Sequence, residues 1–190
     1  MLEKIHISYY PGTRGDFLTC AIMTCLYDDT DYYITDGGRL ILKDQRVNRK
    51  TLDFKLQEVH YKQQHSYNKE NIIGTSHQVT KMRKYVSNKP IIISFDFTDI
   101  DQIILQYEGK NIWAKTDKTK QLEKYSFIKR MSSNKNLSHI LFVKYKDITQ
   151  NLNNIIEQIS KHVGIKLSPN EKTDKLLKEY IQKNNQYERK

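Results

Sequence analysis

The 190-residue sequence contains few residues that cross-link or break a chain: two cysteines, three prolines and seven glycines. Two cysteines cannot build the disulfide framework of a small secreted domain, and so few glycines and prolines leave little room for a long disordered linker. No stretch approaches the about 20 apolar residues that span a bilayer, and the first ten residues lack a signal-peptide pattern. We therefore expect a cytoplasmic protein without a membrane span, folded as a single domain over residues 1–190.

The two cysteines, Cys20 and Cys25, lie five residues apart within a segment whose apolar pattern predicts a helix. That spacing turns the two side chains to different faces of the helix. We expect two buried small side chains rather than a disulfide or a pair of metal ligands.

The formal net charge of +10 is unevenly distributed along the chain. Residues 1–109 contain 14 basic and 14 acidic side chains, whereas residues 110–190 contain 18 and 8. The densest stretch, residues 110–135, has eight basic and two acidic residues. It is either a solvated basic surface or a patch that binds phosphate, sulfate or nucleic acid. In the nucleic-acid case Trp113 and Tyr125 would stack on bases, although no RNA- or DNA-binding motif is present.

Short runs rich in β-branched and aromatic residues predict four strands. The third run, "PIIISFDF", is apolar for most of its length, which is typical of a strand buried on both faces of a parallel sheet. Residues 31–70 give no clear pattern. The predicted strands are residues 4–10, 71–77, 90–97 and 139–145.

Helical patterns follow these strands. Residues 16–28 form the first helix, and "TDID" from Thr98 reads as a capping box for a helix that continues to about Tyr107 and stops at Gly109. An apolar stripe after residue 147 predicts a helix that ends at Gly164 in a left-handed cap. Ser168, with Pro169 and Glu171, reads as the N-terminal cap of the last helix.

Strands that alternate with helices predict an α/β layered domain, a three-layer sandwich around a mainly parallel central sheet. Ligands of such sheets bind at the carboxyl ends of the strands, and the stretch "PGTRGD", residues 11–16, lies at such an end before a helix. Its amides would cradle an anion. The alternative is a tight turn with Asp16 as the helix N-cap. The loop lacks the lysine and hydroxyl of GxxxxGK[ST], which argues against magnesium-dependent ATP hydrolysis.

Four segments resemble the sulfotransferase family in order and spacing. "ISYYPGTRGDFL" is similar to the family's 5'-phosphosulfate-binding loop, and "IIGTSH" is similar to the strand that ends in a Thr-His pair. "PIIISFDFTDID" resembles the strand that leads to an acidic residue at a helix start. The most specific match is "LFVKYKDITQNLNNIIEQISKHVGI", with Tyr145, Asp147 and Ile148 at the corner between strand and helix.

The resemblance implies a P-loop-like fold and a metal-free enzyme. The donor would be 3'-phosphoadenosine 5'-phosphosulfate (PAPS), and the acceptor a hydroxyl or amine of a small molecule or glycan. Arg14 would supply the catalytic cation and His77 the base. The residues implied in holding the 5'-phosphosulfate are Gly12, Thr13, Arg14, Gly15, Asp16 and Phe17.

One part of the family pattern is missing. Where the family has an arginine for the 3'-phosphate, this chain has Phe95 or Asp96, and Ile103 stands near the place of the family's serine. Lys129 and Arg130 from the basic stretch would then supply that contact. The alternatives are a noncatalytic protein with the same fold, a polyanion- or nucleic-acid-binding protein that uses residues 110–135, and a nucleotide kinase variant.

Overall fold

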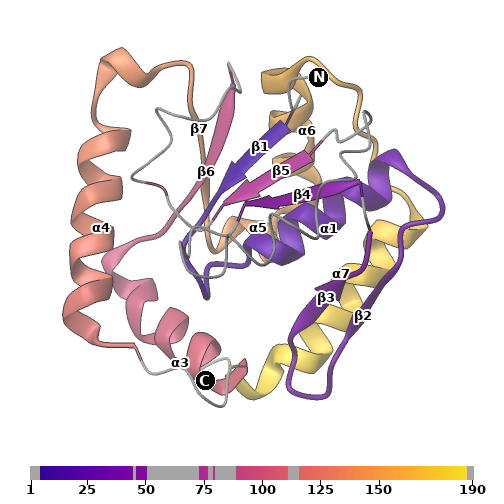
Figure 1. The fold of residues 1–190 in the computed structure, drawn as a ribbon, viewed down its shortest axis with the longest axis horizontal. Coiled ribbons are helices and arrows are strands. Elements are labelled where there is room, and N and C mark those ends of the chain that lie inside the picture. Colours follow the sequence, from indigo (N-terminus) through magenta and orange to yellow (C-terminus); the bar gives the residue numbers. More distant parts are fainter. Residues whose placement is uncertain are drawn as a thin grey trace, which may run out of the picture.

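A computed structural model of the chain describes residues 5–44, 46–50, 73–76, 79, 89–110 and 116–187. At its centre is a five-stranded sheet in which every pairing is parallel, in the order β4-β5-β1-β6-β7 (Figure 1). The α/β fold with a mainly parallel sheet that the sequence predicts is confirmed. The strands of this sheet are β1 (Ile5–Ser8), β4 (Val47–Lys50), β5 (Ile73–Ser76), β6 (Pro90–Ser94) and β7 (Leu141–Lys144).

Strand β1 lies in the middle of the sheet because it pairs with β5 on one side and β6 on the other. All four of its residues are buried, as are the first four residues of β6. Strands covered on both faces need apolar residues at successive positions, which explains the continuous apolar runs in the sequence. The carboxyl ends of the two strands therefore lie side by side and position the loops that follow them.

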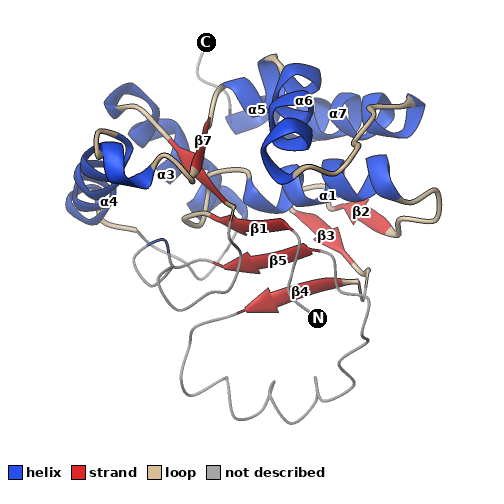
Figure 2. Ribbon diagram, turned by 90° about the horizontal axis from the view of Figure 1, so that it is seen from above, coloured by secondary structure: helices blue, strands red, loops and turns tan. Residues whose placement is uncertain are grey.

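The helices form a layer beside the sheet and extend past its edge. In Figure 2, α1, α5, α6 and α7 lie on one side of the sheet, while α3 and α4 lie beside β7. None of the described helices is long and apolar enough to cross a membrane. The helix bounds are α1 (Gly15–Leu26), α3 (Ile100–Lys110), α4 (Lys118–Ser132), α5 (Asp147–Gln150), α6 (Leu152–Val163) and α7 (Glu171–Asn184).

Two predicted helix starts are wrong by about two residues. The capping box before α3 uses Asp96 and Asp99 instead of Thr98, because a 3-10 turn (η2, Phe97–Asp99) precedes the helix. The last helix is capped by Asn170, whose side chain accepts from two backbone amides, and not by Ser168. Gly164 does end α6 with a left-handed φ of 71°.

Gly109 lies inside α3 and does not stop it. A Cβ at this position would lie 2.2 Å from the ring of Tyr187, so the missing side chain makes room for an aromatic residue from the end of the chain. The Tyr187 hydroxyl lies 3.0 Å from the carbonyl oxygen of Gly109 and 2.9 Å from that of Gly37. One side chain thereby joins α3 to the segment that the sequence left unassigned.

That segment contains a small antiparallel hairpin, β2 (Tyr32–Ile34) and β3 (Leu40–Leu42), outside the main sheet. It packs beside α7 (Figure 1). Asn184 donates to the carbonyl oxygen of Gly38 in the turn, at 3.2 Å, and to that of Tyr180 within α7, at 2.8 Å. The hairpin is therefore fixed by residues almost 150 positions further along the chain.

Both cysteines lie on α1 and are free thiols, Cys20 buried and Cys25 partly buried. Burial raises the pKa of the Cys25 thiol. The prediction of a buried side chain is confirmed for Cys20, whereas Cys25 is only partly buried.

Candidate functional site

The loop between β1 and α1 curls through two residues with left-handed backbone conformation. Gly12 has a φ of 89°, and Arg14, the residue directly before the helix, has a φ of 63°. A non-glycine residue in this region costs about 1 to 3 kcal/mol and is found most often at functional sites. The amide and the hydroxyl of Thr13 both donate to the carbonyl oxygen of Tyr10, at 3.1 and 2.6 Å, and hold the turn closed.

The two glycines of the loop have different roles. A Cβ on Gly12 would lie 2.8 Å from the carbonyl oxygen of Ile103, so this glycine lets the loop approach α3. A Cβ on Gly15 would lie 2.0 to 2.3 Å from atoms of the Tyr9 ring, so the missing side chain makes room for that ring. Unlike Gly12, Gly15 does not have a positive φ. Both close approaches hold the loop against its neighbours.

No side chain of the described residues caps the first turn of α1. Its N-cap residue is Arg14, which makes no capping hydrogen bond, and Asp16 accepts a hydrogen bond from the Tyr9 hydroxyl at 2.8 Å. The interpretation of Asp16 as the N-cap is therefore wrong. In the described part of the chain, the amides of Gly15 and Phe17 have no hydrogen-bond acceptor. Uncapped amides and the helix dipole together favour an anion at this position.

Arg14 connects the loop to the corner after β7. Its side chain is 7% exposed, and its guanidinium carbon lies 4.2 Å from the centre of the Tyr145 ring. One guanidinium nitrogen donates to the Thr149 hydroxyl at 2.6 Å and to the Tyr145 carbonyl oxygen at 3.3 Å. Two segments that carry the family resemblance thus meet through this residue, which positions the loop.

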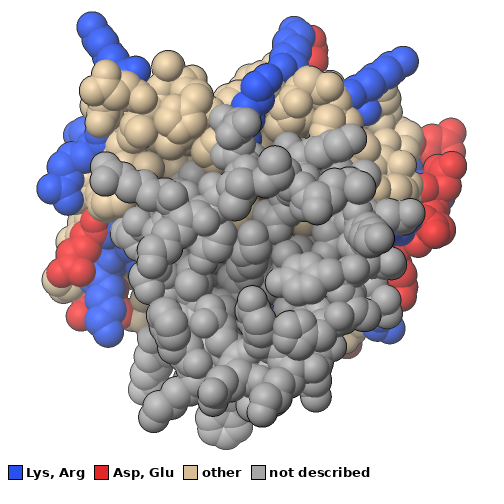
Figure 3. All heavy atoms as spheres, turned by 45° about the horizontal axis from the view of Figure 1, so that its top comes forward, with Lys and Arg blue, Asp and Glu red and all other residues tan. Residues whose placement is uncertain are grey.

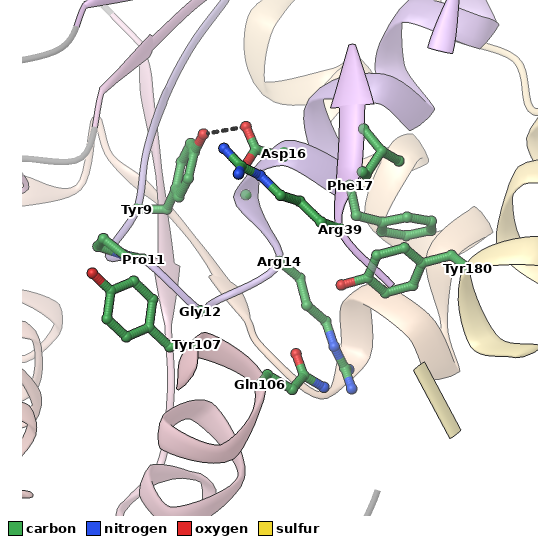
Figure 4. A pocket seen from close by; sticks show the side chains of 12 residues that line it. Tyr9, Pro11, Gly12, Arg14, Asp16, Phe17, Arg39, Gln106, Tyr107 and Tyr180 are labelled. Atoms are coloured by element: carbon green, nitrogen blue, oxygen red, sulfur yellow. Dashed lines mark hydrogen bonds between the residues drawn. The ribbon is translucent and has the colours of Figure 1, made fainter. Parts of the chain in front are cut away.

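The loop opens onto a cavity of about 250 Å³ between the start of α1, the β2–β3 hairpin, α3 and α7 (Figure 4). Pockets that take a whole drug-sized ligand measure about 300 to 1,000 Å³, so this space suits the reacting ends of ligands rather than an entire nucleotide. The side chains and backbone that line it belong to Tyr9, Pro11, Gly12, Arg14, Gly15, Asp16, Phe17, Arg39, Leu40, Gln106, Tyr107 and Tyr180.

Two polar residues on the cavity wall were not expected from the sequence. Gln106 on α3 is 0% exposed, and neither its amide nitrogen nor its amide oxygen has a hydrogen-bond partner among the residues that the structure describes. Arg39 directly precedes β3 and is exposed, and no ion pair to its guanidinium occurs within the described ranges. Figure 4 shows its side chain extending toward Asp16 and Tyr9.

The end of β6 has no basic residue for a 3'-phosphate. Phe95 is buried, and the backbone amide of Asp96 is held by the Asp99 carboxylate at 2.8 Å. Asp99 also forms an ion pair with Lys146 at 2.9 Å, which raises the pKa of that lysine. This corner is therefore an acidic helix start, and Ile103 is buried against Gly12.

The predicted 3'-phosphate contacts on α4 are not part of this cavity, and their role stays a prediction. Lys129 and Arg130 are exposed in its last turn and do not line the cavity. Lys124, two turns from the start of the same helix, places its ammonium 5.1 Å from the centre of the Tyr10 ring. Burial and the neighbouring Lys120 lower the pKa of Lys124. Its helical spacing from the buried residues Gln121 and Ile128 was a signal in the sequence that could have identified it.

On the face seen in Figure 3, the basic side chains of the described residues do not form one continuous patch. There, Lys and Arg side chains project separately, and acidic side chains lie among them. Tyr125 packs beside Phe95 and Phe97, with ring centres 6.3 and 6.2 Å away.

His77 and Trp113 lie outside the described residues, so their predicted roles stay predictions.

Comparisons with known proteins point to one family. The sequence model described as "Sulfotransferase domain" matches residues 116–189, and no curated protein matches the sequence. The fold is similar to the crystal structure of mouse sulfotransferase SULT7A1 complexed with PAP, with a TM-score of 0.54 and 13% identity over 93% of this chain. The chain spans 63% of that protein's length. The chain is therefore similar to a sulfotransferase in fold, and residues 116–189 match the sulfotransferase domain in sequence.

Proposed function

We propose that the protein is a PAPS-dependent sulfotransferase that acts on a hydroxyl or amine of a small molecule or glycan. The observation that carries the proposal is the start of α1, where the uncapped amides of Gly15 and Phe17 lie at the edge of the cavity. Such a helix start binds a phosphate or sulfate group without any metal. The sulfotransferase fold and the match over residues 116–189 support the same assignment.

The residues around the loop fit the phosphosulfate end of PAPS. Gly12 and Arg14 supply the curled backbone, and the first-turn amides of α1 supply hydrogen-bond donors. Arg14 stays packed on Tyr145, where its charge lies close to the loop and holds it in shape. For the 3'-phosphate the chain offers the lysines of α4, Lys124 and Lys129, together with Arg130, in place of a residue at the end of β6.

Bound PAPS would supply a sulfuryl group already attached to a good leaving group, the 5'-phosphate. The chain then has three tasks: to hold the leaving phosphate, to orient the acceptor, and to receive the proton that the acceptor loses. The α1 amides perform the first task and the cavity wall the second. We assign the third to His77, in agreement with the family's Thr-His pair.

The first experiment is a thermal shift of the full chain with adenosine 3',5'-bisphosphate. A ligand present at 100 times its dissociation constant stabilises the folded state by about 2.7 kcal/mol. We expect a clear increase in Tm with the bisphosphate and a much smaller one with ATP and magnesium. A larger shift with ATP would favour a nucleotide kinase and contradict the proposal.

The second experiment tests the base. His77→Ala should abolish sulfuryl transfer from PAPS and leave the affinity for the bisphosphate nearly unchanged, because the imidazole acts on the acceptor side. Turnover equal to that of the wild type would remove His77 from the active site.

A noncatalytic role is the second candidate, because the acidic corner formed by Asp96 and Asp99 stands where the family holds a 3'-phosphate. Absence of any shift with the bisphosphate would favour that role. Binding of a polyanion that falls steeply with added salt would instead favour a nucleic-acid-binding function.

A further inference from the structure

We propose that Arg39 and Gln106 form an acceptor subsite in the cavity, which takes an acceptor carrying an anionic group beside its hydroxyl or amine. The proposal rests on the proposed function, since that function makes the second ligand of the cavity an acceptor. Nothing in the sequence resemblance assigns a role to either residue.

Gln106 supplies the first line of evidence. A buried amide without partners is rare in folded proteins, because it loses its hydrogen bonds to water and gains none. Gln106 is 0% exposed and lines the cavity, and within the described part of the chain neither its amide donor nor its amide acceptor has a hydrogen-bond partner. A ligand hydroxyl, which both donates and accepts, would satisfy such an amide.

Arg39 supplies the charge. Its guanidinium is exposed and has no ion pair among the residues that the structure describes, whereas Arg46, a few residues later, is held by Asp44 and Asp29. A guanidinium presents paired donors that match a carboxylate, sulfate or phosphate. Of the two described arginines that line the cavity, Arg14 is packed on Tyr145, so Arg39 is the one that we match with an anionic group on the ligand.

The position of Arg39 is built into the fold. The turn before it is held by Asn184 through the Gly38 carbonyl oxygen, and a Cβ on Gly38 would lie 2.8 Å from the Asn184 side chain. The Tyr187 hydroxyl reaches both Gly37 of this turn and Gly109 at the end of α3, the helix of Gln106. Asn184 and Tyr187 are therefore positioning residues for the two ligand-binding side chains.

The remaining wall suits a ring. Phe17 and Tyr180 lie in contact, with ring centres 4.3 Å apart, and both line the cavity with Tyr107. The cavity of about 250 Å³ corresponds to roughly eight water molecules at about 30 Å³ each, which is room for one sugar or phenol ring. The apolar faces would contact the ring while Arg39 and Gln106 bind its substituents.

Two matched pairs of probes test the subsite in the full-length chain by titration calorimetry, with and without adenosine 3',5'-bisphosphate. One pair is methyl β-D-glucuronide and methyl β-D-glucoside. The other is 4-hydroxyphenylacetate and 4-hydroxyphenylacetamide. Within each pair only the charged group changes, and the two pairs separate a glycan acceptor from a phenolic one.

We expect the carboxylate of at least one pair to bind about tenfold more tightly than its neutral partner, the effect of one charge-assisted hydrogen bond. Arg39→Gln should remove this preference, and Arg39→Lys should retain part of it. Gln106→Leu should weaken both members of the pair about equally, by roughly fivefold, without changing the affinity for the bisphosphate. Lys166→Gln, the same charge change at an exposed residue that does not line the cavity, should behave as wild type.

The outcomes separate the two proposals. Bisphosphate binding without any carboxylate preference overturns the subsite and leaves the proposed function standing. A carboxylate preference that Arg39→Gln removes, in a chain that does not bind the bisphosphate, overturns the proposed function and supports the subsite as a general anion site. A preference that survives Arg39→Gln overturns the role of Arg39.

Discussion

Replacing Gln106 with leucine should stabilise the free protein. In most helices the loss of a buried polar side chain costs stability, because its hydrogen bonds are lost as well. Gln106 has none to lose among the described ranges, where neither polar atom of its amide has a hydrogen-bond partner. Leucine has a similar volume and an equally good helix propensity, so α3 accepts it without strain.

The size of the effect follows from the desolvation of the amide. An unsatisfied buried polar group costs about 1 to 3 kcal/mol, and leucine removes that cost while keeping the packing. For a chain of this length, 1 kcal/mol changes Tm by about 2 to 4 °C. An increase of about 4 to 8 °C therefore corresponds to a gain of about 2 kcal/mol.

The assay is thermal unfolding of the ligand-free chain, with Gln121→Leu as the matched control. Gln121 on α4 is also buried, and its amide oxygen likewise has no partner among the described residues, but its amide nitrogen donates to the Thr116 hydroxyl at 3.0 Å. Leucine there loses a hydrogen bond, so its Tm should stay equal to or below that of the wild type. If Gln106→Leu lowers Tm as much as Gln121→Leu does, the Gln106 amide is satisfied in solution and the reasoning fails.

Three further predictions concern the loop, the hairpin and the response to alkaline pH. Arg14→Ala should lower the free energy of unfolding in urea by about 2 kcal/mol and weaken bisphosphate binding, because the contacts to Tyr145 and Thr149 are lost. Arg14→Gly should recover about 1 kcal/mol of that stability, because glycine adopts the positive φ without strain. If Arg14→Ala has the stability and the bisphosphate affinity of the wild type, the loop is only a turn. Asn184→Ala should reduce the preference of the cavity for the carboxylate probes in calorimetry and leave the bisphosphate affinity intact, because it frees the turn that carries Arg39. An unchanged preference would mean that the hairpin keeps its shape without Asn184. Burial raises the pKa of Tyr10 and of Tyr32 to about 12, so both hydroxyls keep their protons in the folded state above pH 10, where the unfolded chain releases them. The stability that these two tyrosines contribute is complete below pH 10 and is lost between pH 10 and 12. In urea unfolding over that range, the free energy of unfolding should fall less steeply with pH in Tyr10→Phe than in the wild type or in the exposed control Tyr33→Phe. Equal slopes would contradict the burial effect.

The sequence predicted the parallel sheet well because its signals are local. Each of the four expected strands contains an observed one, β1, β5, β6 and β7, and the apolar stripe of α6 is present. The helix starts were less accurate. Asp96 and Asn170 each compete with a nearby serine or threonine for the same amides, and backbone geometry decides between such neighbours.

The acceptor side of the cavity was not predicted for a different reason. Arg39 reaches the cavity because the hairpin is held against α7, in part by Asn184, a contact between residues more than 140 positions apart. Gln106 did leave a trace in the sequence, since it follows Ile100 and Ile103 at helical spacing on a buried face. A polar residue on the otherwise apolar face of a helix was the signal in the sequence that could have identified Gln106.

The arrangement of Tyr187 couples the two walls of the cavity. Its single hydroxyl hydrogen can point to only one carbonyl at a time, Gly37 of the hairpin or Gly109 of α3. A ligand that pulls Arg39 inward would favour one of these two orientations. Occupancy at one wall would thereby alter how firmly the other is held.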